Sequence, residues 1–301
     1  MRASGGPTFL CIGAQKAGTT WLYDALNRAD GVYVPPVKEL HHFDRLDKKT
    51  IGAKVASADQ PDTGTALYKK NKGRRQRTLA RLRGHLLRGE FRTLWFYYQF
   101  LGVKRDDAWY DALFPRRFSV AGEITPEYAL LSDEMIGQIT QRYPDIKVLY
   151  LLRNPIDRAW SQFRYELVRA GWSDVGALYM NASLHNPRMG PRGFYPRHVQ
   201  AWRAHLKPGH LMLGFYDALT HRPQVLLDEI AAFIGSGPLK GRAERVYATG
   251  DADLPDDFMD AAMKVYADTL VEMDGLWGGY CSDWAAGTLC SEKDRPAALI
   301  L

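Results

Sequence analysis

Short apolar runs alternate with amphipathic segments along the 301 residues of the chain. The run Phe9-Leu10-Cys11-Ile12 has no polar positions, which is typical of a strand buried on both faces of a parallel sheet. Apolar residues spaced three and four apart indicate helices between such runs. The predicted strands are residues 9–12, 32–34, 118–122, 147–152 and 211–216. The predicted helices are residues 19–26, 107–114, 132–143, a helix that starts at Pro155, 197–205, 223–234 and 256–273.

This order of strands and helices predicts an α/β fold with a central five-stranded, mainly parallel sheet flanked by helices. A hydrophobic content of 46% is enough for one large core. The chain has no internal repeat and no low-complexity linker, so we expect one domain over residues 1–301.

The compartment expected from the sequence is the cytoplasm. The first strand begins so close to Met1 that no signal or membrane anchor fits before it, and no later apolar run reaches spanning length. Three cysteines make neither a disulfide framework nor a zinc site. Cys11 is expected to be a buried thiol, and Cys281 and Cys290 are expected to be free thiols, although a short hairpin could pair them.

A glycine-punctuated turn from Gly13 to Gly18 joins the first strand to the first helix. Strand, loop and helix in this order gather backbone N–H groups and the positive end of a helix around one point, and Lys16 adds a charge. This is a site for phosphate or sulfate. A magnesium-dependent kinase or ATPase needs lysine directly after the second glycine, whereas here Thr19 and Thr20 follow Gly18, so those activities are disfavoured.

The stretch Gly13-Ala14-Gln15-Lys16-Ala17-Gly18-Thr19-Thr20 resembles the 5′-phosphosulfate loop of sulfotransferases that use 3′-phosphoadenosine 5′-phosphosulfate (PAPS). A later stretch, Val148 to Ser161 with Arg153-Asn154-Pro155, resembles the 3′-phosphate motif of the same family. The resemblance implies a P-loop-like fold, PAPS as donor, adenosine 3′,5′-bisphosphate (PAP) as product and no metal. It is strongest to the heparan-sulfate-type branch, although the chain resembles soluble bacterial members because those of the Golgi carry an N-terminal membrane helix.

The resemblance also implies which residues bind the cofactor. Arg153 and Ser161 would clamp the ribose 3′-phosphate, with an Arg153–Asp157 ion pair as the alternative. Tyr195, in a Gly-x-Tyr element, would contact the cofactor or pack in the core. The remaining expected cofactor-binding residues are Gln15, Lys16, Ala17, Gly18, Thr19, Thr20 and Trp21 in the loop and first helix, and Lys240, Gly241 and Arg242 in a basic loop.

Glu39 stands where the heparan-sulfate-type relatives carry their proposed general base, and a carboxylate near the anion loop suits removal of a hydroxyl proton. A surface pair of Glu39 with Lys38 is the alternative interpretation. His41 and His42 are rival bases, and a metal at these histidines is disfavoured because no third ligand has suitable spacing. With Lys16, these three residues are the candidate catalytic residues.

The strand at residues 118–122 is expected to present Glu123 at its carboxyl end, where ligands bind in open α/β sheets. Glu123 is therefore a secondary candidate for acid–base or acceptor binding, with a structural hydrogen bond or ion pair as the favoured role. Relatives often have lysine where Ile124 stands, and its absence puts the role of that lysine in doubt here.

Basic residues are concentrated in one segment. From residue 68 to residue 105 twelve Lys and Arg stand against one acid, Glu90, whereas the whole chain has a net charge of +6. We expect a basic helical insertion at about residues 51–106, which could cover the active site, hold an anionic substrate or lie on a membrane. Nucleic acid is a less favoured partner. Residues 171–192, rich in Gly, Asn, Pro and Ser, are expected to form a second lid over the substrate.

The sequence thus predicts an enzyme that transfers a sulfuryl group from PAPS to an acceptor hydroxyl on a carbohydrate, a glycolipid or a natural-product alcohol, in line and without metal. The alternative is a non-catalytic protein that binds a nucleotide and uses the basic insertion to hold a polyanion or a membrane.

Overall fold

The computed structural model describes residues 5–47, 96, 100, 105–170, 183–186, 189–241, 254–288 and 295–301. Most of the predicted basic insertion, most of the predicted lid, Arg242 and Cys290 lie outside the described residues. The predictions made for them stay predictions.

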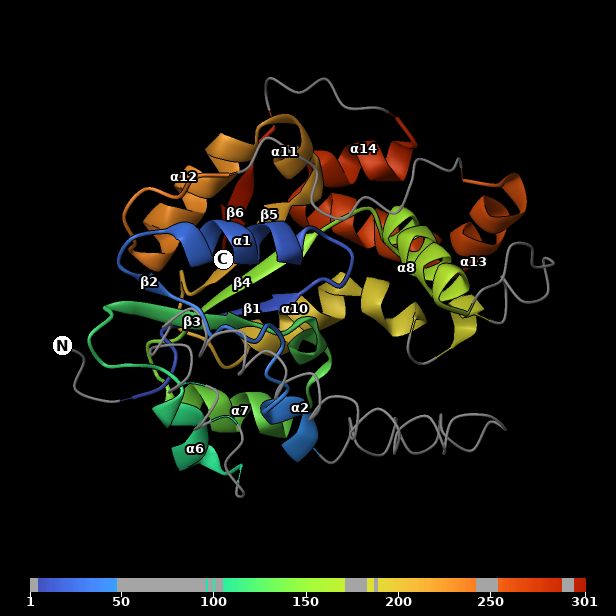
Figure 1. Ribbon diagram of the computed structural model, residues 1–301. Helices are drawn as coiled ribbons and strands as arrows, with labels where there is room; N and C mark the ends of the chain where they lie inside the picture. Colours follow the sequence, from blue (N-terminus) through green and yellow to red (C-terminus); the bar gives the residue numbers. More distant parts are fainter. Residues whose placement is uncertain are drawn as a thin grey trace.

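A six-stranded sheet forms the centre of the molecule, with strand order β2-β3-β1-β4-β5-β6 (Figure 1). Neighbours among the first five strands pair in parallel, and β6 pairs antiparallel with β5. The strands are β1 (Phe9–Gly13), β2 (Val32–Tyr33), β3 (Val120–Ile124), β4 (Lys147–Leu152), β5 (Leu211–Phe215) and β6 (Ala298–Ile300). The predicted α/β class and mainly parallel sheet are confirmed. The sixth strand was missed because three residues at the end of the sequence are too short a run to be recognised.

The third strand lies two residues later than predicted. Phe118 donates its N–H to Pro115 O in a turn, so it precedes the strand. Pairing with β1 then places Phe9 opposite Gly122 and Cys11 opposite Ile124. Glu123 is consequently inside β3 and not beyond its end, which decides how that carboxyl group is used.

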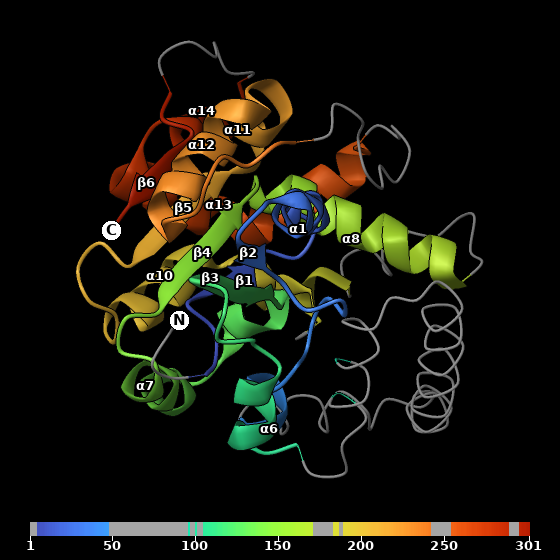
Figure 2. The same cartoon turned by 60° about the vertical axis from the view of Figure 1, so that its left-hand side comes forward.

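Helices cover both faces of the sheet (Figure 1; Figure 2). Helices α1, α8, α11 and α12 lie on one side, and α7 and α10 lie on the other. The long α13 packs against α8 and α14. The helices are α1 (Thr19–Arg28), α2 (Phe43–Leu46), α6 (Asp107–Ala112), α7 (Asp133–Arg142), α8 (Pro155–Ala170), α10 (Tyr195–Arg203), α11 (Tyr216–His221), α12 (Pro223–Ile234), α13 (Asp256–Trp277) and α14 (Tyr280–Ala286), with 3₁₀ turns η1 (Pro126–Leu130) and η2 (Gly190–Gly193).

Local sequence signals account for several helix starts. The Ser132 hydroxyl accepts the Met135 N–H at 3.3 Å and caps α7, as predicted. Pro196 in the first turn of α10 fits because that position needs no hydrogen-bonded N–H. Helix α10 therefore starts at Tyr195, two residues earlier than expected.

Strand order reverses around β1, since the chain passes from β1 to β2 on one side and later enters β4 on the other. The carboxyl end of β1 is therefore a switch point, the position where open α/β sheets bind ligands. All five residues of β1 are buried, so the loop that follows it is anchored in the core.

Two of the cysteines are buried free thiols. Burial raises the pKa of Cys11 to about 12, and Cys281 is also buried without a disulfide. No helix in the described parts of the chain has the length and apolar character needed to span a membrane.

Candidate functional site

The loop after β1 delivers the start of α1 to the switch point. Gly18 precedes the helix with φ 86°, and a Cβ at this position would meet Leu219 Cδ1 at 2.4 Å, so both backbone conformation and packing require glycine. No side chain caps α1. The first N–H groups of a helix have no intrahelical partner and carry its positive end, so this helix start can hold an anion.

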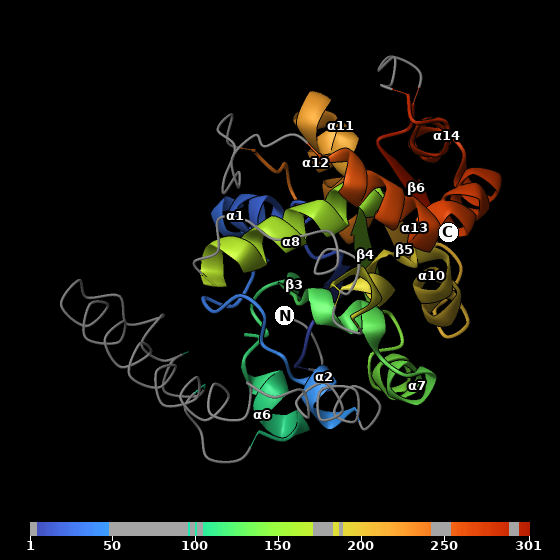
Figure 3. The same cartoon turned by 90° about the vertical axis from the view of Figure 1, so that its right-hand side faces the viewer.

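Lys16 lies beside this helix start in a left-handed conformation with φ 70°. Its ammonium lies 3.7 Å from the centre of the Tyr165 ring, which belongs to α8. Figure 3 shows α1 and α8 next to each other on the same side of the sheet. Burial, assisted by the positive charges of Lys38 and Arg153, lowers the pKa of Lys16 to about 8. Three cationic side chains thus gather around one helix start.

Arg153 follows β4 and contacts the loop directly. Its Nη1 donates to Lys16 O at 3.2 Å, and its guanidinium lies 4.5 Å from the centre of the Tyr216 ring. Within the described part of the chain Arg153 Nε is buried and has no hydrogen-bond partner. No ion pair joins Arg153 to Asp157 among these residues. Ser161, two turns into α8, is buried.

The predicted basic loop lies against α1. A Cβ on Gly241 would come within 3.1 Å of Trp21 Cζ2 and 3.2 Å of Leu227 Cδ1. Arg28 Nη2 donates to Lys240 O at 3.2 Å. The structure therefore brings Trp21, Lys240 and Gly241 together, and a larger residue at position 241 would need these side chains to shift by a few tenths of an ångström.

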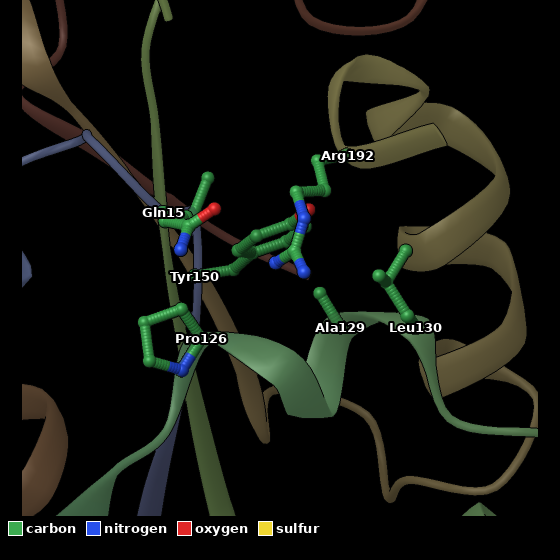
Figure 4. Close-up of a pocket in the computed structure, with 7 residues that line it drawn as sticks. Gln15, Pro126, Ala129, Leu130, Tyr150 and Arg192 are labelled. Carbon is green, nitrogen blue, oxygen red and sulfur yellow. The ribbon is translucent and has the colours of Figure 1, made fainter. Parts of the chain in front are cut away.

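The Gln15 side chain lies in a hollow whose other lining residues are not those around the start of α1. The hollow is small (Figure 4). Gln15 comes from the loop after β1 and Arg192 from η2, and the other lining side chains labelled in the figure are Pro126, Ala129, Leu130 and Tyr150. The Gln15 Oε1 atom is buried without a hydrogen-bond partner in the described residues. Arg192 forms a two-bond ion pair with Glu127 beside it. The hollow is too narrow to admit a substrate.

Lys38 connects Glu39 to the start of α1, which follows the anion loop. The Lys38 Nζ donates to Thr19 Oγ1 at 3.2 Å, Thr20 Oγ1 at 3.0 Å and Glu39 Oε1 at 3.2 Å. The Glu39 side chain is 40% exposed. Burial raises its pKa, but hydrogen bonding to His41 and the charge of Lys38 outweigh burial and lower the pKa to about 2. Glu39 is therefore an ionised carboxylate beside the anion loop.

His41 links Glu39 to a buried aspartate. Its Nδ1 is 3.0 Å from Asp44 Oδ2, and its Nε2 is 3.7 Å from Glu39 Oε2. Burial lowers the pKa of His41, yet hydrogen bonds to Asp44 and Glu39 prevail and raise it to about 9. At neutral pH the ring is protonated and has no lone pair to accept a proton. The geometry therefore disfavours His41 as the base and makes it a cation that holds Glu39.

His42 does not reach the site. It is 3% exposed, stacks on Tyr110 with ring centres 4.4 Å apart, and lies with Nε2 3.2 Å from Asp107 Oδ1. Burial lowers its pKa. This geometry disfavours His42 as a rival base, because its ring is buried among aromatic side chains and offers little surface to an acceptor hydroxyl.

Three of the residues discussed share an unusual backbone. Lys16, Glu39 and His41 have φ values of 70°, 63° and 55°, a region that costs energy for residues other than glycine. Such conformations cluster at functional sites, where the surrounding structure holds them in place. Here the hydrogen bond from Glu39 N to Ile124 O fixes the strained segment to β3.

The model of the "Sulfotransferase family" matches residues 7–237. The chain is a member of the sulfotransferase family. Among curated relatives, human heparan sulfate glucosamine 3-O-sulfotransferase 6 is 25% identical over 143 residues, which are 44% of this chain and 40% of that protein. Bovine bifunctional heparan sulfate N-deacetylase/N-sulfotransferase 2 is 28% identical over 110 residues, 32% of this chain and 12% of that protein.

These matches span less than half the length of either relative. A solved structure, a sulfotransferase from Alicyclobacillus acidocaldarius, superposes with a TM-score of 0.60 at 21% identity and covers 90% of this chain and 95% of that one. At this identity the likeness shows a shared fold. The expected family and its P-loop-like fold are confirmed.

Glu123 is a structural residue in this geometry. Its side chain is 2% exposed and accepts hydrogen bonds from Tyr110 Oη at 2.5 Å, Thr125 Oγ1 at 2.7 Å, Tyr128 Oη at 2.9 Å and Leu40 N at 3.2 Å. Burial raises its pKa. The favoured role, a structural hydrogen bond, agrees with this network, and the network anchors the segment that carries Glu39.

Tyr195 also has a packing role. Its ring is fully buried and meets Tyr150 edge to face, with ring centres 5.7 Å apart. No surface of Tyr195 is available to a ligand in this structure. Of the two roles considered for it, core packing is the one that the geometry supports.

Sequence reasoning missed three residues of the site: Lys38, Asp44 and Tyr165. Lys38 was considered only as a surface partner of Glu39. Tyr165 follows Ser161 by one helical turn, and Asp44 follows His41 by three residues in α2. Helical spacing could have drawn attention to Tyr165, but only the fold shows what Tyr165 and Asp44 contact.

Proposed function

We propose that the sulfotransferase moves a sulfuryl group from PAPS to an acceptor hydroxyl. One observation supports this most directly: Lys38 contacts both hydroxyl groups at the start of α1 and the Glu39 carboxylate. An ionised carboxylate therefore lies beside an anion-binding helix start. A transferase that joins an anionic group to a hydroxyl needs these two features together.

The residues present fit the donor. The uncapped start of α1, with Lys16 and the N–H groups of residues 17–20, would hold the phosphosulfate. Arg153, whose Nε is buried without a partner in the described residues, would hold the 3′-phosphate with Ser161. Trp21 and Gly241 would lie beside the nucleotide. When bound, PAPS supplies an activated sulfuryl group.

Glu39 would take the proton of the acceptor hydroxyl as the new bond forms. His41 and Asp44 orient it, since the protonated imidazole lies between the two carboxylates. Lys16 would offset negative charge that grows on the leaving group, a role for pre-placed donors. These groups supply the charge stabilisation that a metal would otherwise give. The acceptor is proposed to be an alcohol of a carbohydrate, a glycolipid or a natural product, and the place of action the cytoplasm.

Calorimetric titration with PAP and with ADP, both without magnesium, tests this proposal. The two nucleotides differ in where their second phosphate is attached, so we expect PAP to bind at least tenfold more tightly than ADP through Arg153. Arg153→Met should remove the preference, whereas Arg203→Met, at an exposed position of α10, should keep it. Equal affinities for PAP and ADP in the unaltered protein would contradict the proposal and favour the non-catalytic alternative.

A further inference from the structure

Lys38 is a cation shared between two parts of the site. Its three ammonium protons face three oxygen atoms: the hydroxyl oxygens of Thr19 and Thr20 on α1, and Oε1 of Glu39. The side chain is 20% exposed. An ordinary surface pair would join two solvated side chains, but this lysine joins the Glu39 carboxylate to a helix start that lies 19 positions before Lys38 in the chain.

The partners of Lys38 are unequal in charge. Two are neutral hydroxyls, and only Glu39 is an anion that neutralises the ammonium. Any anion that binds at the start of α1 brings new negative charge within reach of the same ammonium, because Thr19 and Thr20 are the first two residues of that helix. Glu39 and the incoming anion must then compete for one cation.

We propose that Lys38 is held by Glu39 in the donor-free protein and turns to the sulfuryl group when the donor binds, which releases Glu39 to act as the base. This inference rests on the proposed function. It assigns to Lys38 a contact with the part of PAPS that PAP lacks, and it assigns Arg153 and Lys16 to the parts that the two nucleotides share.

The movement of Lys38 from Glu39 to the sulfuryl group explains why Glu39 is such a weak base in the donor-free protein. With Lys38 and His41 beside it, Glu39 has a pKa of about 2, far from the value that suits proton transfer near neutral pH. Loss of the Lys38 contact leaves His41 as the cation that contacts Glu39 among the described residues. Glu39 then becomes more basic only when the sulfuryl group is in place.

The test compares affinities for PAP and PAPS by calorimetry, without acceptor. Lys38→Met should weaken PAPS binding by about tenfold to a hundredfold and leave PAP binding within twofold. Lys38→Arg should restore part of the PAPS affinity because it keeps the charge. The matched control is Lys207→Met, since Lys207 pairs with Asp145 on the surface before β5 and should change neither affinity.

Glu39→Gln gives the opposite sign and is a second, independent variant. Without the competing carboxylate, Lys38 is free for the sulfuryl group, so PAPS should bind several-fold more tightly than to the unaltered protein. In the double variant with Lys38→Met this gain should vanish. Equal effects of Lys38→Met on PAP and PAPS, or a gain from Glu39→Gln that persists without Lys38, would overturn the inference. Failure of the unaltered protein to prefer PAP over ADP would instead remove the proposed function and the inference with it.

Discussion

Glu39 is followed by Leu40, whose N–H donates to Glu123, but the surroundings of the two carboxylates differ. Glu123 is buried and accepts hydrogen bonds from neutral groups: three side-chain hydroxyls and the Leu40 N–H. Glu39 is 40% exposed and faces the charged groups of Lys38 and His41. Burial acts in the same direction on both and raises the pKa of each carboxyl group. The cations reverse this at Glu39, where the pKa falls to about 2.

The difference separates the structural role of Glu123 from the catalytic role proposed for Glu39. Neutral donors fill the acceptor positions of Glu123 and fix it in the core, where it holds the backbone of the neighbouring segment. Glu39 is partly exposed, and its charged partner Lys38 can leave it for another anion. Glu123 therefore positions the segment, and Glu39 is available to a substrate.

The largest effect is expected from Glu39→Gln. The amide keeps the shape but cannot accept a proton, so turnover should fall by about 10² to 10⁴-fold while PAP still binds. Steady-state assays with PAPS and calorimetry with PAP measure the two properties. Retention of most turnover would show that Glu39 is not the base and would remove the contrast with Glu123.

Glu123→Leu should instead affect folding. Four donors lose their acceptor in a buried position, and we expect the free energy of unfolding to fall by about 3–5 kcal/mol. Urea denaturation measures this loss. Glu272→Leu, at an exposed position of α13, is the control and should change stability by about 0.5 kcal/mol or less. A stable Glu123→Leu protein would mean that the network does not support the segment.

The sequence allowed the anion loop to be placed because a buried strand, Gly13 to Gly18 and an amphipathic helix form a local unit. The same holds for Arg153, which follows the buried β4 directly. Spacing along the chain determines these positions, so they could be predicted without the fold. The antiparallel β6 could not, because its three residues depend on pairing with β5.

The histidines show the limit of such reasoning. His41 and His42 are adjacent and chemically identical, and nothing in the sequence separates them. Tertiary contacts do: His41 lies between two carboxylates, and His42 is enclosed by aromatic rings that include Tyr110. Lys38 was underestimated for the same reason, since its contacts to Thr19 and Thr20 exist only once β2 is placed beside β3.

His41→Asn should destabilise the protein in a pH-dependent way. The folded-state pKa of about 9 lies above the ordinary 6.5, so protonation of His41 stabilises the folded state. This contribution is fully present below pH 6.5 and is lost as the pH rises through 9. Asn also tolerates the left-handed backbone. Urea denaturation should show a loss of about 1–2 kcal/mol at pH 6 that shrinks between pH 6.5 and pH 9 and is nearly absent above pH 9.

Tyr110→Phe is the control for that pH dependence, because it removes a neutral donor and its cost should be the same at pH 6 and pH 9. A constant difference between His41→Asn and the unaltered protein across this range would show that the charge of His41 does not matter. His41 would then act on Glu39 as a neutral partner, as Tyr110 acts on Glu123.

The smallest effects should come from single hydroxyls around Glu123. Tyr110→Phe removes one of its four donors and should lower the free energy of unfolding by about 1 kcal/mol, with turnover within twofold. Tyr128→Phe should cost more, because the Tyr128 hydroxyl donates to Glu123 and also accepts the His42 N–H at 3.0 Å. Losing it leaves a buried backbone donor unpaired, which costs more than losing a donor that has substitutes. Urea denaturation of the two variants gives the ranking. The reverse ranking, or a loss of turnover in Tyr110→Phe as large as that in Glu39→Gln, would show that the Glu123 network takes part in the chemistry.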